Sequence, residues 1–197
     1  MYFVPHTYPY QNPYYQPMYC YGTQAGYWAI PVMEGYGNGL GSLRSSDGDD
    51  NIMLRDYGAN PFVVNINEAT KQNSTFRTAL WTGKHLQVTL MSIDVGEDIG
   101  LEMHPDVDQF LRVEQGQGIV RMGKSKDNLN FERSVYDDSA ILLPAGTWHN
   151  LINTGNIPLR LYSIYAPPNH PFGTVHVTKA DALAAEEGYG HNNSSNG

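Results

Sequence analysis

Short apolar runs separated by turn-forming residues fill most of the chain after residue 60. The strand-like runs are 77–81, 86–93, 110–120, 141–143, 148–152 and 158–166. Runs of this length, rich in β-branched and aromatic residues and bounded by Gly, Pro or Asn, are typical of strands. An extended stretch at 61–66, a short helix from Asn67 and a polar hairpin near 124–130 complete the pattern. It predicts an all-β fold in which antiparallel strands close into a barrel.

Alternation along two of these runs assigns side chains to faces. If Gln109 points into the barrel, Leu111 and Val113 point inward too, whereas Arg112 and Glu114 point outward.

The run at 148–152 follows the same rule. His149, Leu151 and Asn153 share the interior face, and Trp148 lies outside or at the rim. The interior beside the histidine is therefore expected to be apolar, and no inward pair of Arg or Lys residues is identified for binding a substrate phosphate.

The pattern changes after residue 166. Thr178 is a good N-cap for an Ala-rich helix that ends near Gly188. We expect this short C-terminal helix to pack on the outside of the barrel.

The first 45 residues differ sharply from the rest. They are rich in Tyr, Pro and Gly, hold nine of the 14 tyrosines, and carry only Glu34 and Arg44 as charged side chains. We expect this low-complexity segment to be disordered in isolation, while its dense aromatic residues favour self-association. The sequence thus predicts a tail and linker at 1–45, a barrel at 46–190 and a polar C-terminal tail at 191–197.

Charge and composition exclude some function classes. The formal net charge is −8, and Lys and Arg form no cluster, which disfavours nucleic acid and anionic membranes as partners. A small polar molecule or another protein is expected instead. The chain lacks an apolar run of about 18 residues and a signal-peptide pattern, so we expect synthesis in the cytoplasm and retention in the cell. Cys20 is the only cysteine, which excludes an intrachain disulfide.

The candidate chemistry begins between Gly96 and Gly116. Glu102 and His104 are two residues apart, which on a strand places both side chains on one face, where they can share an ion. Gln109 opens the next strand and can direct its amide toward the same interior.

A second window, from Pro144 to Asn153, adds an imidazole. Pro144 and Gly146 form a turn, and His149 begins the strand that follows. The four candidate donors are Glu102, His104, Gln109 and His149. One carboxylate, one amide and two imidazoles suit one divalent transition metal, namely Zn, Mn, Fe, Ni or Co.

These windows resemble the paired motifs of the cupin superfamily. The first family motif contains Gly, His-x-His, Glu and Gly, and the second reads Pro-x-Gly-x-x-His-x-x-x-Asn. The spacing fits at every step, and His104 and His149 match the family's histidines. The resemblance covers about residues 54–187 and implies a jelly-roll cupin barrel with a metal site. By the same resemblance, we expect a homodimer.

Three positions depart from the family pattern. Glu102 stands where the first His is expected, Gln109 stands where the Glu is expected, and Asp138 replaces the Gly that leads the second motif. The donor set keeps a single negative charge, and its Gln is a weak neutral ligand.

The stretch LEMHPD at 101–106 is also similar to a segment of zinc-dependent mannose-6-phosphate isomerases, whose metal ligands include Gln, Glu and two His. This resemblance implies an isomerase-like enzyme acting on a sugar-like substrate. The fold by itself leaves the chemistry open. A non-catalytic structural or assembly protein and a small-ligand binding module are the alternatives.

Segments like 1–45 resemble those of bacterial spore coat proteins. The resemblance implies incorporation into a spore coat or similar layer, through contacts between the tail and coat-layer proteins.

Individual residues also have alternative interpretations. The two motif histidines could be structural imidazoles in a barrel without metal, and Gln109 could be a hydrogen-bonding interior amide. His85 could reach the barrel mouth as a general base, whereas His170 and His176 are expected to be surface or hydrogen-bonding residues.

Overall fold

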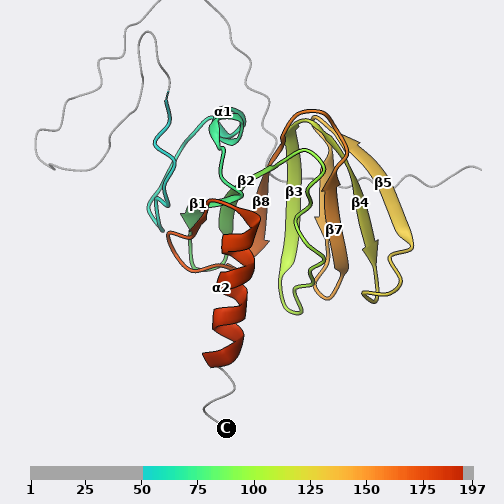
Figure 1. The fold of residues 1–197 in the computed structure, drawn as a ribbon. Helices are drawn as coiled ribbons and strands as arrows, with labels where there is room; N and C mark the ends of the chain where they lie inside the picture. The colour runs from blue at the N-terminus through green and yellow to red at the C-terminus, as the bar shows by residue number, and fades with distance from the viewer. Residues whose placement is uncertain (1–50, 193–197) are drawn as a thin grey trace, which may run out of the picture. The chain divides into compact units, whose positions relative to one another are not determined.

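A computed structural model describes residues 51–192 of the 197-residue chain. In this range the strands form two antiparallel sheets that pack against each other around one core (Figure 1). The predicted all-β, antiparallel barrel with a short C-terminal helix is confirmed. The tail predicted at 1–45 lies outside the described residues, as do 46–50 and 193–197.

The larger sheet has the strand order β6-β3-β8-β2-β1-β9, and the smaller has the order β5-β4-β7. The larger contains β1 (Arg77–Thr82), β2 (Gln87–Ile93), β3 (Asp108–Gln115), β6 (Ala140–Leu143), β8 (Leu159–Ala166) and β9 (Val175–His176). The smaller contains β4 (Gln117–Gly123), β5 (Phe131–Tyr136) and β7 (Trp148–Asn153). The apolar runs form strands where expected, whereas β5 and the two-residue β9 lie outside the predicted runs.

Apolar side chains from both sheets fill the core. Leu111, Val113 and Leu161 enter it from the larger sheet, and Val120 and Leu151 enter it from the smaller one. Each of the five is at most 3% exposed. Full burial of such a side chain contributes about 1.5–3 kcal/mol, so this core is the main source of the barrel's stability.

The outer face of the larger sheet is covered by the segment that precedes it. Residues 52–66 run over this face without forming a strand, and apolar side chains such as Phe62 pack against Leu80 and Leu90. Helix α1 (Ile66–Gln72) follows, with Asn65 as its N-cap. The helix begins one residue before the predicted start.

This covering layer explains why one side chain of β3 departs from the predicted alternation of buried and exposed residues. Gln109, Leu111 and Val113 are buried, as alternation predicts, but Glu114 is buried as well. The strand register shifts near Val113, and Asn67 of α1 donates a hydrogen bond to Glu114. Glu114 is therefore buried beneath α1, which alternation within one strand does not reveal.

Helix α2 (Lys179–Asn192) begins at the predicted N-cap. The Asp181 N–H donates to Thr178 Oγ1 at 3.2 Å, and the Thr178 N–H donates to the Asp181 carboxylate at 2.8 Å. This reciprocal pair is a capping box. The helix continues past Gly188, so residues 191 and 192, expected in the polar tail, belong to α2. Within residues 51–192, no helix is long and apolar enough to cross a membrane.

Candidate metal centre

A short backbone bridge between the two motifs positions the first ligands. Glu102 lies between β2 and β3, outside any named strand, where we expected strand geometry. Its N–H donates to the His149 carbonyl at 3.0 Å, and the His149 N–H donates to the Glu102 carbonyl at 2.9 Å. Residues bonded reciprocally in this way lie directly opposite each other. The bridge therefore sets the Glu102 side chain beside that of His149.

The turn before β7 joins the motifs at a second point. Gly146 has a φ of 78°, a conformation that glycine adopts readily and other residues rarely do. Its N–H donates to the His104 carbonyl at 2.7 Å. The backbone thus fixes both histidines relative to each other.

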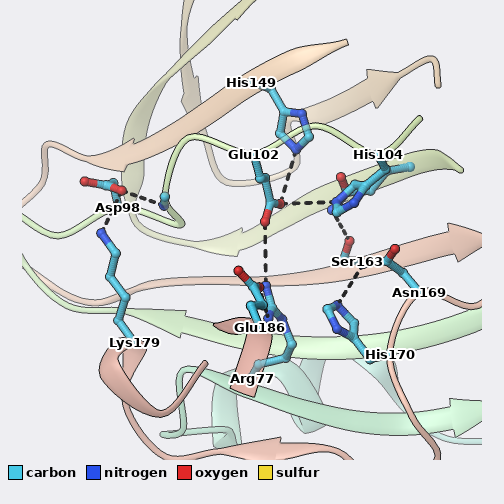
Figure 2. Close-up of polar contacts among 12 residues, drawn as sticks. Arg77, Asp98, Glu102, His104, His149, Ser163, Asn169, His170, Lys179 and Glu186 are labelled. Atoms are coloured by element: carbon cyan, nitrogen blue, oxygen red, sulfur yellow. Dashed lines mark hydrogen bonds and ion pairs between the residues drawn. The ribbon is translucent and has the colours of Figure 1, made fainter. Parts of the chain in front are cut away.

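Glu102, His104 and His149 form a compact cluster (Figure 2). One candidate ligand atom from each lies within 4.8 Å of the others. The Nε2 atoms of His149 and His104 are 3.3 Å and 3.5 Å from the same oxygen, Glu102 Oε1. Such a spacing fits one central ion bound at about 2.0–2.2 Å by each donor.

Both imidazoles have an Nε2 atom available for an ion. His149 Nδ1 donates to the Thr147 carbonyl at 2.9 Å, which leaves Nε2, the ring nitrogen nearest Glu102, as the atom that would bind a metal. His104 Nε2 is buried and has no hydrogen-bond partner among the described residues. A cation at the centre would satisfy all three groups, so the residues fit a divalent metal.

The charge state of Glu102 favours the same ion. Burial opposes ionisation of this carboxyl group, but contacts with His104 and His149 and the charge of Arg77 outweigh it and hold its pKa far below the usual range. Glu102 is therefore a carboxylate at neutral pH.

Gln109 lies on the neighbouring wall. It is 4% exposed, its Nε2 donates to Ser163 Oγ at 3.0 Å, and its Oε1 has no partner among the described residues. Across the β3–β8 pairing it faces Tyr165, whose ring meets the His104 ring edge-on at 5.7 Å between centroids. The structure thus gathers three of the four predicted ligands in one cluster and leaves the Gln109 oxygen free in the same interior.

Sequence reasoning missed Arg77. This residue is 1% exposed, and its Nη2 lies 3.9 Å from Glu102 Oε2. Four consecutive residues, 77–80, are buried, so β1 has no alternation from which an inward face could be predicted. The only signal was a charged residue at the start of an apolar run.

The prediction of an apolar interior is wrong for the side of the cluster where Arg77 lies. Residues of β7 supply apolar surface as expected, but β1, β2 and β8 bury Arg77, Thr89, Ser163 and Tyr165. The wall that continues from the metal cluster is therefore polar, because strands remote in sequence add side chains that neither motif contains.

His170 is the second residue whose place the sequence did not show. It is half-buried, and its ring meets Tyr165 in a T-shaped contact at 5.0 Å. Burial, followed by the charge of Arg77, lowers its pKa to about 3. Gln87 holds this loop, since it accepts from the His170 N–H and donates to the His170 carbonyl, both at 2.9 Å.

His85 and His176 also lie outside the cluster. His85 is exposed in the turn between β1 and β2, and His176 is half-buried on β9. The structure does not bring His85 to the candidate metal ligands.

The fold and the ligand cluster are those of a cupin. Residues 89–165, which contain all four predicted ligands, match the family model described as a cupin domain. The chain is 69% identical over 186 residues to the uncharacterised protein YrkC of Bacillus subtilis, an alignment that covers 90% of this chain and 100% of YrkC. It therefore belongs with YrkC to one family of cupin-domain proteins.

Two further relatives agree with this assignment. The uncharacterised protein L612 of Acanthamoeba polyphaga mimivirus is 42% identical over 119 residues, which cover 60% of this chain and 72% of L612. The crystal structure of BH2720 from Bacillus halodurans is 69% identical in sequence, with a TM-score of 0.66, and the match covers 66% of this chain and 99% of BH2720.

Proposed function

We propose that this cupin binds one divalent transition metal through Glu102, His104 and His149 and uses it in chemistry on a small polar molecule. The observation that carries the proposal is the convergence of two imidazole nitrogens on one ionised carboxylate oxygen, at 3.3 Å and 3.5 Å. Gln109 is the proposed fourth ligand, through its free amide oxygen. One negative charge with nitrogen and oxygen donors suits Zn, Mn, Fe, Ni or Co.

Glu102, His104 and His149 would hold the metal, which would supply polarisation of a carbonyl or hydroxyl oxygen of the substrate. Isomerisation of a sugar-like substrate, the reaction implied by the sequence resemblance, would depend on that polarisation. The protein contributes rigid ligands, because Thr147 fixes the His149 ring and the backbone bridge fixes Glu102.

Elemental mass spectrometry on the reconstituted full-length protein tests the metal site. Wild type should hold about one equivalent of a transition metal, and His104→Ala and His149→Ala should each lose most of it, since removing a ligand weakens a metal site by orders of magnitude. His85→Ala is the matched control and should keep the metal, because His85 is exposed and outside the cluster. A metal-free wild type, or retention in both ligand variants with unchanged circular dichroism, would refute the proposal.

A second proposal concerns the tail. We infer that residues 1–45 carry the barrel into a protein layer such as a spore coat. Its support is composition, with nine of the 14 tyrosines and two charged residues in this segment. The alignment with YrkC covers 90% of the chain, so it includes much of this segment. Dense aromatic residues with little charge favour self-association.

Deletion of residues 1–45 separates this role from the metal site. The truncated protein should stay soluble and keep its metal, but should be lost from the insoluble coat fraction of a spore-forming host. A chain with the nine tail tyrosines replaced by Ser keeps the length and should behave like the deletion. Unchanged incorporation of either protein would contradict the assembly role.

A further inference from the structure

Buried polar atoms without partners gather on one wall of the barrel interior. Among the described residues they include Arg77 Nε and Nη1, Thr89 Oγ1, Gln109 Oε1 and the Tyr165 hydroxyl. The Arg77 side chain is only 2% exposed. A buried guanidinium is costly unless its N–H groups donate hydrogen bonds, so an unpartnered one indicates a missing acceptor.

The acceptors that Arg77 has are out of hydrogen-bond reach. Its Nη2 lies 3.9 Å from Glu102 Oε2, and its Nη1 lies 3.8 Å from Glu186 Oε1. Both separations exceed the 2.7–3.2 Å of a protein N–H···O bond. Arg77 therefore lies between two carboxylates without binding either of them closely (Figure 2).

We propose that Arg77 forms a subsite for the carboxylate of a small hydroxy- or oxo-acid, beside the metal ligands. This inference rests on the proposed function, because a second oxygen of the same molecule would meet the metal. The planar guanidinium fork matches a carboxylate in a two-bond arrangement.

The distances set the size of this ligand. Glu102 separates the two half-sites, since its Oε1 faces both histidines and its Oε2 faces Arg77. The two histidines and the guanidinium are thus separated by the Glu102 carboxylate and a gap of 3.9 Å between its Oε2 and Arg77 Nη2. A carboxylate with its second oxygen on the adjacent carbon fits this spacing.

Charge points to an anion as well. A divalent metal and Arg77 would bring three positive charges, of which Glu102 cancels one and the partly exposed Glu186 another. The remaining net charge is plus one, or plus two when Glu186 is displaced, and in a largely buried site it favours a negatively charged ligand.

Glu186 of α2 marks where the ligand carboxylate would lie. It is 58% exposed and is the second carboxylate near Arg77. Gly188 and Gly190 follow in the last turns of α2 and each costs about 1 kcal/mol relative to Ala, which weakens this end of the helix. A ligand carboxylate can therefore displace Glu186, which makes the side chain a built-in competitor.

Calorimetric titration of the full-length protein with glycolate, and with neutral ethylene glycol of similar size, tests the subsite in metal-free and metal-loaded samples. Glycolate should bind at least tenfold more tightly than ethylene glycol. Arg77→Lys should weaken glycolate binding at least tenfold, because Lys keeps the charge but lacks the fork. Glu186→Gln should strengthen binding severalfold by removing the competitor. Arg121→Lys, on the exposed β4–β5 pair, is the control and should change nothing.

Metal content measured in the same samples keeps the two proposals apart. If metal-free wild type binds glycolate and Arg77→Lys weakens that binding, the subsite is supported even when no metal is bound. If the protein loads metal but binds glycolate and ethylene glycol with equal affinity, the subsite is refuted and the metal centre is not. The same holds if Arg77→Lys leaves the affinity for glycolate unchanged. Tighter binding of inorganic phosphate than of glycolate overturns the assignment to carboxylates. Because the comparison of probes uses wild type, a poorly folded variant would not obscure the result.

Discussion

At Glu102, the backbone and the side chain perform separate tasks. The backbone pairs with His149 and joins the two motifs, whereas Oε1 faces both imidazoles and Oε2 faces Arg77. A substitution here can therefore remove the ligand while the bridge persists. The bridge uses only backbone atoms of Glu102, so it does not depend on which side chain stands at this position.

Asp138 offers a test at the residue scale. It has a φ of 69°, which explains why the family motif usually has Gly at this position. Asp138→Gly should be more stable than Asp138→Ala by about 1 kcal/mol, because both lose the ion pair with Arg112 but only Ala keeps the backbone strain. Urea unfolding measures the difference. As a control, Asp137→Gly should be no more stable than Asp137→Ala. Equal stabilities of Asp138→Gly and Asp138→Ala would contradict the role of the backbone conformation.

The lowered pKa of His170 predicts that the stability of the protein depends on pH. Its pKa is about 3 in the folded protein against an ordinary value of 6.5, so the unfolded chain binds the proton more readily. Its contribution to stability is fully present above pH 6.5 and is lost as the pH falls toward 3. His170→Gln should therefore reduce the decline in unfolding free energy between pH 6.5 and 5, where one proton can account for at most about 1.4 kcal/mol per pH unit.

Denaturant unfolding of metal-free protein at several pH values would measure this slope. His85→Gln is the control, since His85 is exposed. Identical slopes in wild type and His170→Gln would show that His170 does not titrate as its surroundings indicate.

At the scale of elements, α2 is linked to the site at two points. Lys179 at its start contacts Asp98 at 2.8 Å, in the segment between β2 and β3 that carries Glu102 and His104, and Glu186 lies beside Arg77 (Figure 2). The helix expected to pack outside the barrel therefore also reaches the group that we propose as an anion subsite.

The N-cap of α2 can be tested directly. Thr178→Ala should lower the unfolding free energy by about 1 kcal/mol, because it removes the acceptor for the Asp181 N–H. Thr178→Ser keeps the hydroxyl and should retain most of the stability. Thermal unfolding followed by circular dichroism distinguishes the two variants, and equal midpoints would refute the role of the cap.

At the scale of the whole molecule, one chain supplies the entire ligand cluster, so assembly is not needed to complete it. The family resemblance nevertheless implies a homodimer that pairs through outer strands. In this barrel β5 is an edge of the smaller sheet, and an edge strand offers unpaired backbone groups to a second strand.

We therefore propose a dimer in solution. Light scattering on the eluting protein should give twice the chain mass of 22.0 kDa. The chain without residues 1–45 should also be dimeric, because the proposed contact lies in the barrel. A monomer at micromolar concentration in both proteins would contradict the expectation, whereas a dimer only in the full chain would assign pairing to the tail.

Local sequence determined the elements and the histidine pair. Alternation fixed the inward faces of β3 and β7, Thr178 fixed the start of α2, and motif spacing selected Glu102, His104 and His149. Such features can be predicted from the sequence because strand periodicity, capping and turns depend on residues within a few positions of one another.

Only the tertiary structure decided what surrounds the candidate metal ligands. Arg77, Tyr165 and His170 come from strands and a loop far from the motifs, and Glu186 comes from a helix outside the barrel core. Glu114 is buried because α1 covers its strand. Burial and charge at these positions depend on which distant segments pack together, and no local pattern in the chain encodes that packing.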